Sequence, residues 1–479
     1  MPGRGAEGVV RRGFDYDEWL RGGGRAPQGQ WTSRDIEHLV LVVHGIGQKL
    51  SERVETFDFT YAINKFRVLM AKQHERMSTA HSPPAVLPIN WRRKIDFDYH
   101  EASSSGQSDE STQIPIHQPF ALSDITPNTI PTVRNIISDV LLDIPYYLSK
   151  HRSRILHAVT AEANRIYRLW MQNNPGWQGK ISIIGHSLGS VIAVDILSRQ
   201  PTVPPPLGSQ NEHLSEEDEL VLEFPVRNLF LAGSPVGFFL LLNRTNLMPR
   251  IMSKARLVAV VMNMAKLDDD AEYEEPDRVG LEPDKIGISH GGVYGCLAVE
   301  NIYNVIHASD PIAYRLNPCV DPTYAAKLRL ANLELPITGD GIFGSLFSRR
   351  SKAPDERCVS EARQANNDVH SADSAGYSFT RGPTLPTSSS RTSSQIELET
   401  RRDFRYDKVI KTRMHCLNEN GQIDFVLQPK GALENQYISI LTAHSGYWES
   451  KEFAYLVALE CSRKEGVENT FESFRAWRK

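Results

Sequence analysis

Residues 181–197 combine the pattern of a buried strand, a tight turn and the pattern of a helix in immediate succession. The β-branched residues that open this stretch predict a strand of a parallel sheet, and residues 188–198 predict a helix. Between them, Gly185 and Gly189 flank Ser187 in a G-x-S-x-G pattern. Glycines at these positions let strand and helix approach closely, while the serine takes a strained turn conformation that exposes its hydroxyl. We therefore predict that Ser187 is a nucleophile. Taken alone, the motif also fits a glycine–serine turn without chemistry.

Backbone N–H groups that would stabilise an oxyanion are predicted at two places. One is Leu188, the first residue of the predicted helix, whose N–H lies at the positive end of the helix dipole. The other follows an apolar strand at residues 39–43, which runs into a His-Gly-Ile-Gly turn. This turn resembles the loop that supplies the second oxyanion N–H in α/β-hydrolases, here from Gly45 or Ile46. An ordinary glycine turn is the alternative interpretation.

A candidate acid and a candidate base follow later strands. Residues 299–307 predict a strand, and Asp310 comes shortly after it and before a proline, in a loop at the carboxyl edge of the sheet. His444 lies in a loop after a strand predicted at residues 421–428. The order serine, aspartate, histidine is that of α/β-hydrolases. Asp424 is an alternative partner for His444, but the Asp-Pro loop favours Asp310.

The remaining predicted elements complete an α/β pattern. Strands are predicted at residues 86–91 and 226–232, and apolar residues at helical spacing predict a helix over residues 151–171. The alternation of strands and helices predicts an α/β-hydrolase-like fold with a doubly wound, mostly parallel sheet. Ser234 is a rival serine, which we assign to a turn because it lacks the G-x-S-x-G pattern.

Three further residues are candidates for substrate binding. Phe238 and Phe239 would line an apolar acyl pocket, with turn structure as the favoured alternative. Arg315 would attract an acidic headgroup, although a structural ion pair is the favoured interpretation of this arginine.

Composition excludes some classes of function. The chain of 479 residues has a formal net charge of −4, which argues against a nucleic-acid binder that relies on phosphate contacts. No apolar run approaches the length of a transmembrane helix, and the N-terminus lacks a hydrophobic signal core. The five scattered cysteines form no C-x-x-C pair, which favours a reducing compartment over a disulfide framework or a zinc site.

Two segments are expected to lie outside the ordered core. Residues 1–35 are rich in glycine and arginine and predict a poorly ordered N-terminal segment. Residues 338–400 are rich in serine, asparagine, arginine and proline and predict a disordered insertion. Aromatic side chains and adjacent arginines at residues 341–350 suit peripheral contact with an anionic membrane, and a plain surface turn fits equally well.

The motifs, taken in this order, resemble the DDHD-domain intracellular phospholipase A1 family. The matching stretches are residues 42–48, 87–91, 185–191, 231–237, 310–315, 423–428 and 444–448. The resemblance implies that residues 36–225 form the N-terminal part of a hydrolase core. A DDHD domain over residues 226–462 would complete that core, and residues 463–479 would form a tail.

The name of this family refers to three aspartates and a histidine, which correspond here to Asp310, Asp424, His444 and Glu452. Glutamate at the last position departs from the expected aspartate, so the part played by this position stays open. The resemblance implies hydrolysis of the sn-1 acyl ester of glycerophospholipids, with phosphatidic acid as a typical substrate. It also implies a cytoplasmic protein that associates peripherally with membranes; a mitochondrial location and a homo-oligomer stay open. We expect no SAM- or WWE-like domain of the kind that some relatives carry.

The predicted mechanism uses His444 to take the proton of Ser187 and Asp310 to orient the imidazole, and it requires neither a metal nor another cofactor. Two other functions stay open. Asp310, Asp424, His444 and Glu452 would together suit a divalent cation and phosphodiesterase-like chemistry. A non-catalytic lipid-binding or membrane-tethering protein would keep the fold without turnover.

Overall fold

A computed structural model describes residues 36–45, 59–77, 82–91, 144, 147–208, 220–250, 291–336, 406–429 and 443–478. Its strands form one seven-stranded sheet in the order β2-β1-β3-β4-β5-β7-β6. All described strand pairs are parallel, which confirms the predicted doubly wound α/β sheet. The strands are β1 (His38–Val43), β2 (Ala85–Pro88), β3 (Lys180–His186), β4 (Val226–Ala232), β5 (Val299–His307), β6 (Ala331–Asn332) and β7 (Asp424–Leu427).

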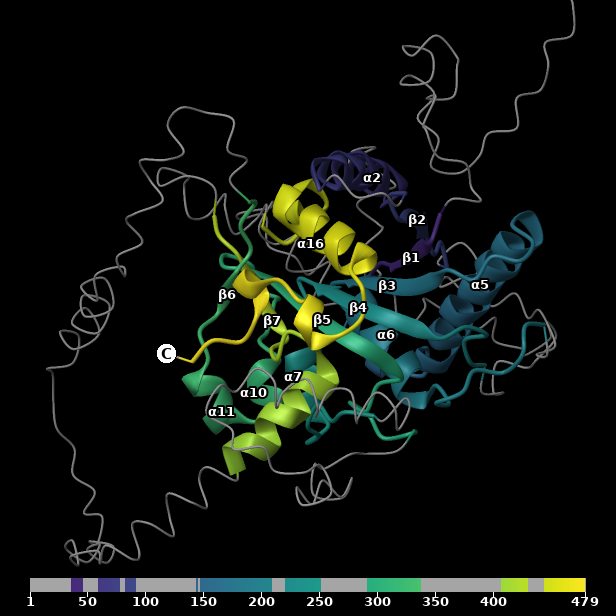
Figure 1. Cartoon of the computed structure of the whole chain (residues 1–479). Helices are drawn as coiled ribbons and strands as arrows, with labels where there is room; N and C mark the ends of the chain where they lie inside the picture. The colour runs from purple at the N-terminus through teal and green to yellow at the C-terminus, as the bar shows by residue number, and fades with distance from the viewer. Residues whose placement is uncertain are drawn as a thin grey trace, which may run out of the picture. The chain divides into compact units, whose positions relative to one another are not determined.

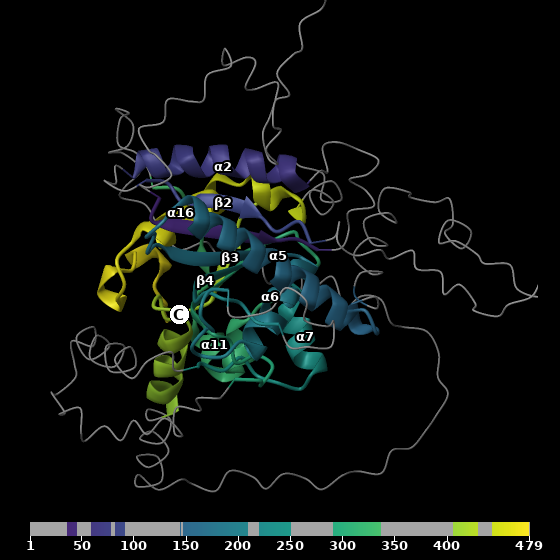
Figure 2. The ribbon, with the colours of Figure 1, turned by 90° about the vertical axis from the view of Figure 1, so that its right-hand side faces the viewer.

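Helices cover both faces of the sheet (Figures 1 and 2), as parallel strands require because each crossover returns over one face. One face carries α2 (Phe59–Arg76) and α16 (Lys451–Ser462), which pack against each other. The other face carries α5 (Arg152–Asn173), α6 (Leu188–Arg199), α7 (Val236–Leu242), α10 (Asn317–Val320) and α11 (Pro322–Lys327). Short 3₁₀ turns are η4 (Gly446–Glu449), η5 (Val467–Asn469) and η6 (Glu472–Phe474). Within the described ranges, no helix has both the length and the apolar character needed to cross a bilayer.

The apolar runs in the sequence explain this layered arrangement. All residues of β1 and β4 are buried, which is expected for strands with helices on both faces. Nearly all of α6 is buried as well, and a helix that is apolar on all sides belongs in the interior of a large domain. Residues 59–76, for which no element is predicted from the sequence, form α2.

Strand order brings several loop positions to one edge of the sheet. Val43 pairs with Gly185, His186 with Ala232, and Ala232 with Val305, so these strands end at nearly the same level. β1 and β3 are neighbours in the sheet. The chain continues from β1 to β2 on one side and from β3 to β4 on the other, so the strand order reverses between β1 and β3. A crevice forms outside the carboxyl ends of the strands at such a switch point.

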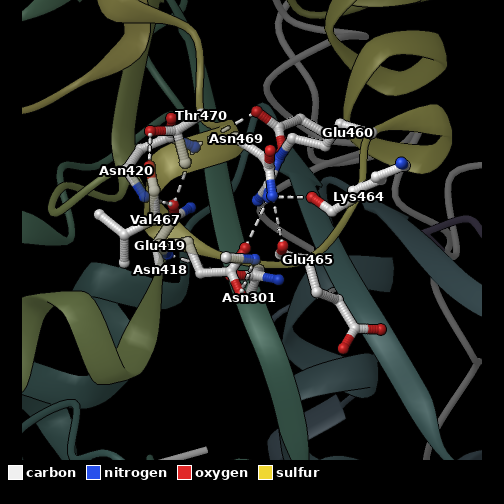
Figure 3. A network of polar contacts seen from close by, with 12 residues as sticks. Asn301, Asn418, Glu419, Asn420, Glu460, Lys464, Glu465, Val467, Asn469 and Thr470 are labelled. Atoms are coloured by element: carbon white, nitrogen blue, oxygen red, sulfur yellow. Dashed lines mark hydrogen bonds and ion pairs between the residues drawn. The ribbon is translucent and has the colours of Figure 1, made fainter. Parts of the chain in front are cut away.

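A buried polar network fastens the end of α16 to the sheet (Figure 3). Arg463 pairs with Glu460, and its Nη1 lies 2.6 Å from the Glu419 carboxylate. The backbone N–H of Glu419 donates to the Asn301 side chain on β5 at 3.1 Å. Because these groups are buried, each depends on the others for its hydrogen bonds. The network thereby fixes α16, the helix that follows residues 443–450.

Several predicted elements differ slightly in length, and others lie outside the described residues. The strand expected at residues 421–428 spans only Asp424–Leu427, and the one expected at 86–91 spans Ala85–Pro88. The chain divides into two compact units, one with residues 1–334 and 406–479 and one with residues 335–405. The expected insertion at 338–400, the stretch at 341–350 and the N-terminal segment 1–35 fall outside the described residues. The proposed domain boundaries stay predictions.

Candidate active site

Ser187 lies at the strained turn between β3 and α6. Its backbone has φ 54° and ψ −130°, a conformation that is rare for a residue with a side chain and is retained where the surroundings enforce it. The backbone N–H of Ser187 donates to the carbonyl oxygen of Ala232 at 3.0 Å, which holds the turn. A Cβ at Gly185 would lie 2.6 Å from the Cα of Ser190, and one at Gly189 would lie 2.3 Å from the carbonyl oxygen of Val43. Both flanking glycines are therefore sterically required.

The structure brings Ser187, His444 and Asp310 together from the ends of three strands. Nε2 of His444 lies 2.9 Å from Oγ of Ser187. Nδ1 of the same ring lies 3.1 and 3.0 Å from the two carboxylate oxygens of Asp310. Ser187 directly follows β3, Asp310 lies three positions after β5, and His444 lies after β7 and shortly before α16. The spacing and order allow a proton to pass from the serine hydroxyl to an imidazole that a carboxylate orients.

Asp310 is buried and kept as a carboxylate by several donors. Its Oδ1 accepts a hydrogen bond from the backbone N–H of Ile312 at 2.9 Å, and its Oδ2 accepts one from the hydroxyl of Tyr447 at 2.8 Å. Burial acts to raise the pKa of Asp310, but the hydrogen bond and charge of His444, with the other two donors, lower it overall. A carboxylate is the form that can accept a proton-bearing Nδ1.

A small residue is required beside this carboxylate. Gly233, just after β4, has φ 57°, which already disfavours a side chain. A Cβ there would lie 2.8 Å from Oδ2 of Asp310 and 3.1 Å from Nδ1 of His444. Gly233 therefore leaves the space in which the aspartate and the histidine meet.

Two groups lie close to where an oxyanion would form beside Ser187. Leu188 is the first residue of α6, so its N–H lies at the free end of that helix. A Cβ at Gly45 would lie 3.4 Å from the backbone nitrogen of Leu188 and 3.6 Å from Cβ of Ser187, so Gly45 borders the nucleophile. Ile46, the alternative donor, lies outside the described residues.

Asp424 is held in a different set of contacts. Its carboxylate accepts hydrogen bonds from the Asn304 side chain at 2.9 Å and from the backbone N–H groups of Leu316 and Asn317 at 2.8 and 3.0 Å. Burial raises the pKa of Asp424 even though these donors favour the charged form. Nε of Arg315 lies 3.7 Å from the same carboxylate, so this arginine takes part in the structural ion pair that the sequence analysis favours. Asp424 thus anchors the loop that follows Asp310.

The other candidate residues have packing or capping contacts. Phe238 and Phe239 lie on the helix α7, which corrects the turn structure favoured from the sequence. Phe239 is buried, and Phe238 is partly buried and stacks on Tyr314 with ring centroids 5.9 Å apart. Glu452 accepts a hydrogen bond from Ser450 in the first turn of α16 at 2.9 Å. Ser234 is buried, and its hydroxyl lies 2.7 Å from that of Ser190, as fits a turn residue.

The four residues that match the family name do not form a metal site. Asp310, Asp424, His444 and Glu452 all belong to the part of the chain that the structure describes, and no group of three or more metal-ligating side chains occurs there. Asp424 accepts a hydrogen bond from Asn317, at the start of α10, whereas Glu452 accepts one from Ser450, at the start of α16. The arrangement does not favour the divalent-cation alternative.

Two residues at the site were not identified from the sequence. His186 and Tyr447 both contact the candidate triad, the first through the backbone of His444 and the second through Asp310. Both lie inside matched motifs, the first directly before Ser187 and the second three positions after His444. Their closeness in sequence to Ser187 and His444 is the signal from which these two residues could have been predicted.

A family model described as DDHD domain matches residues 222–343 and 344–461 of this chain. The chain is 30% identical over 452 residues to a probable mitochondrial phospholipase of Schizosaccharomyces pombe, covering 88% of this chain and 54% of that protein. It is 27% identical over 453 residues to a probable mitochondrial phospholipase of Saccharomyces cerevisiae, covering 92% of this chain and 51% of that protein. It is also 26% identical over 525 residues to triacylglycerol hydrolase DDHD2 of Mus musculus, covering 90% of this chain and 69% of that protein. The chain spans about half the length of the two fungal relatives, and no solved structure matches it.

Proposed function

We propose, since the chain belongs to the DDHD-domain phospholipase family, that it hydrolyses lipid esters with Ser187 as nucleophile, His444 as base and Asp310 as the orienting acid. The observation that carries this proposal is the continuous contact from Ser187 Oγ to His444 Nε2 and from His444 Nδ1 to Asp310. The strained turn at Ser187 supports it further, because strain of this kind is retained at functional sites.

The proposed reaction proceeds through an acyl-enzyme. His444 takes the hydroxyl proton as Ser187 Oγ attacks the ester carbonyl, and the N–H groups of Leu188 and of Gly45 or Ile46 stabilise the resulting oxyanion. The tetrahedral intermediate collapses, the C–O bond to the lipid alcohol breaks, and His444 returns its proton to that alcohol. Water, deprotonated by His444, then attacks the acyl-serine. The bond from the acyl carbon to Ser187 Oγ breaks, His444 returns the proton to Oγ, and the fatty acid is released. Asp310 stabilises the imidazolium in both halves.

The finer proposal is a phospholipase A1 that cleaves the sn-1 ester of glycerophospholipids, with phosphatidic acid as the substrate to test first. The two fungal relatives named phospholipase support this class, and the relative named triacylglycerol hydrolase makes a neutral lipid the comparison substrate. Arg315 pairs with Asp424, so this arginine is not included in the proposed headgroup site.

Helix α7 supports a substrate that resides in a membrane. It begins three positions after Gly233, and all its residues other than Gly237 are large and apolar. Phe238, Leu241 and Leu242 share one helical face, on which Leu241 is 73% and Leu242 52% exposed. A helix that is apolar all round is usually covered. We propose that this face contacts the lipid surface beside the catalytic crevice.

The proposed location is the surface of an intracellular membrane. Two relatives carry the word mitochondrial in their names, and peripheral contact with an anionic mitochondrial or other intracellular membrane would present the substrate. The stretch at 341–350 stays a second candidate for that contact.

The deciding experiment compares fatty-acid release from mixed phospholipid and triacylglycerol vesicles by wild-type protein, Ser187→Ala and the control Ser462→Ala, with and without chelator. Ser462 lies in the last turn of α16, where its hydroxyl bonds to the Ala458 carbonyl. We expect hydrolysis that survives the chelator, persists in Ser462→Ala and disappears in Ser187→Ala. Activity that persists in Ser187→Ala and disappears with chelator would favour the metal-dependent alternative. Vesicle binding without turnover in any form would favour the non-catalytic alternative.

A further inference from the structure

We propose that Tyr447 is a positioning residue, which fixes the carboxylate of Asp310 and thereby the orientation of the His444 ring. The inference rests on the proposed serine-hydrolase function and adds a residue to it. Its starting point is the 2.8 Å hydrogen bond from the Tyr447 hydroxyl to Oδ2 of Asp310, the oxygen that also lies 3.0 Å from Nδ1 of His444.

The direction of this hydrogen bond follows from the second contact of the hydroxyl. The backbone N–H of His307, at the end of β5, donates to the Tyr447 oxygen at 2.9 Å. That oxygen therefore already accepts a hydrogen bond, and the single hydroxyl hydrogen is directed to the Asp310 carboxylate. Burial, together with the nearby charge of Asp310, raises the pKa of Tyr447 well above its usual value, so the hydroxyl keeps its proton.

The hydroxyl completes the set of donors around Asp310. Oδ1 has the backbone N–H of Ile312 at 2.9 Å, and Oδ2 has Tyr447, so each oxygen has a donor besides the imidazole. Two donors on opposite oxygens determine the plane of a carboxylate. Because Asp310 is buried, removal of the Tyr447 hydroxyl leaves Oδ2 with only the imidazole as a donor among the described residues, and Oδ1 shares that donor. The carboxylate would then rotate or bind the imidazole less symmetrically.

The ring of Tyr447 is itself held rigidly. It packs edge-on against Phe453 on α16 at 6.4 Å and against His186 at 5.9 Å. On a third side, the ring lies against Gly233, where an added Cβ would be only 2.9 Å from Cε2 of Tyr447. Since Tyr447 and His444 belong to the same short segment before α16, the tyrosine joins the loop of the base to the loop of the acid.

The test compares Tyr447→Phe with Tyr455→Phe. Tyr455 is a buried tyrosine of α16 whose raised pKa has burial as its sole cause, so it is a matched control outside the site. Two rates are measured: turnover on phospholipid vesicles, and covalent labelling of Ser187 by a fluorophosphonate, which reports nucleophile activation without the lipid. We expect Tyr447→Phe to lower kcat and the labelling rate by about 10- to 100-fold with KM changed by less than about 2-fold, and Tyr455→Phe to match wild type.

The pH profile separates positioning from a general loss of structure. The hydroxyl helps to lower the pKa of Asp310, so its removal raises that pKa. Without this hydrogen bond, the Asp310 carboxylate attracts the protonated imidazole more strongly, so we expect the acid-side loss of labelling in Tyr447→Phe to occur at higher pH than in wild type. If Tyr447→Phe melts at a markedly lower temperature, 4-aminophenylalanine at position 447 replaces it, because its amine keeps a donor and should retain most of the labelling rate.

Two results would overturn the inference. One is a Tyr447→Phe enzyme that labels and turns over like Tyr455→Phe, and the other is a 4-aminophenylalanine enzyme that is as slow as Tyr447→Phe. Failure of the proposed function itself is distinct, because Ser187→Ala would then still be labelled or still hydrolyse lipid.

Discussion

Nε2 of His186 lies 2.8 Å from the carbonyl oxygen of His444, and the two rings lie 5.0 Å apart. Because a carbonyl oxygen only accepts, His186 donates from Nε2. Burial, with the nearby His444, lowers the pKa of His186 to about 3, so this ring is neutral at neutral pH. The residue directly before the nucleophile therefore anchors the backbone of the candidate base, while Asp310 contacts its side chain.

Replacement of His186 by Phe should slow catalysis without weakening substrate binding. The segment that carries His444 would lose one buried hydrogen bond, and we expect kcat to fall by about 2- to 10-fold with KM unchanged. His157→Phe is the control, since His157 is a partly buried histidine on α5. Steady-state kinetics on vesicles would measure both variants. Wild-type kcat in His186→Phe would show that the backbone contact is dispensable.

Stability should fall as the pH drops from about 6.5 towards 3. Burial lowers the pKa of both His38 and His186 from 6.5 to about 3, so the folded protein keeps both rings neutral while the unfolded chain protonates them. Their folded-state pKa values are depressed, so the stability they contribute is complete above about pH 6.5 and is lost as the pH falls through this window. Each contributes on the order of a few kcal/mol.

Thermal unfolding between pH 4 and 8 checks this dependence. A His38→Gln variant keeps a polar group beside Ser182, which lies 2.7 Å from Nε2 of His38, but it no longer titrates. We expect its Tm to fall less steeply towards pH 4 than that of wild type. Identical slopes for the two proteins would show that His38 does not contribute to the acid sensitivity.

Substitution of Asp310 should lower activity, whereas substitution of Asp424 should lower stability. Asp310→Asn leaves the shape of the site but presents an amide to Nδ1 of His444, and we expect kcat to fall by about 1,000- to 10,000-fold. Asp424→Asn places an amide where the backbone N–H groups of Leu316 and Asn317 donate, and we expect a loss of about 1–3 kcal/mol in the free energy of unfolding. Urea unfolding and vesicle kinetics measure both. The opposite pattern would make Asp424 the catalytic acid.

The exposed face of α7 should contribute to binding of anionic vesicles. Leu241→Asp places a charge on that face, and we expect vesicle binding to weaken about 10-fold or more while labelling of Ser187 by a fluorophosphonate stays unchanged. Val203→Asp is the control, because Val203 is 80% exposed but lies beyond the end of α6, at the opposite edge of the sheet. Sedimentation with vesicles gives the affinities. Equal binding by the two variants would place the membrane contact elsewhere.

Most of the sheet could be predicted from the sequence because its longer strands are rich in β-branched and other apolar residues. Residues 226–232 and 299–307 were predicted with the bounds that the structure has. The short strand β6 and the helices α2, α7, α10 and α11 were missed. β6 has only two residues, too few for a pattern. In α2, by contrast, Phe59, Ile63, Phe66 and Met70 recur at helical spacing, a signal that could have predicted this helix.

The sequence by itself determined the turn at Ser187, since a strand, two glycines and a helix within residues 180–199 specify it through local sterics alone. Only the tertiary structure decided which carboxylate meets His444. The sequence offers Asp310, in a loop after one strand, and Asp424, inside the strand expected at residues 421–428. In the structure, Asp424 lies at the start of β7 and accepts hydrogen bonds from the backbone N–H groups of residues 316 and 317. The contact of His444 with Asp310 spans 134 positions. Such a contact depends on strand order and on where each strand ends, and these are set by packing of the whole sheet.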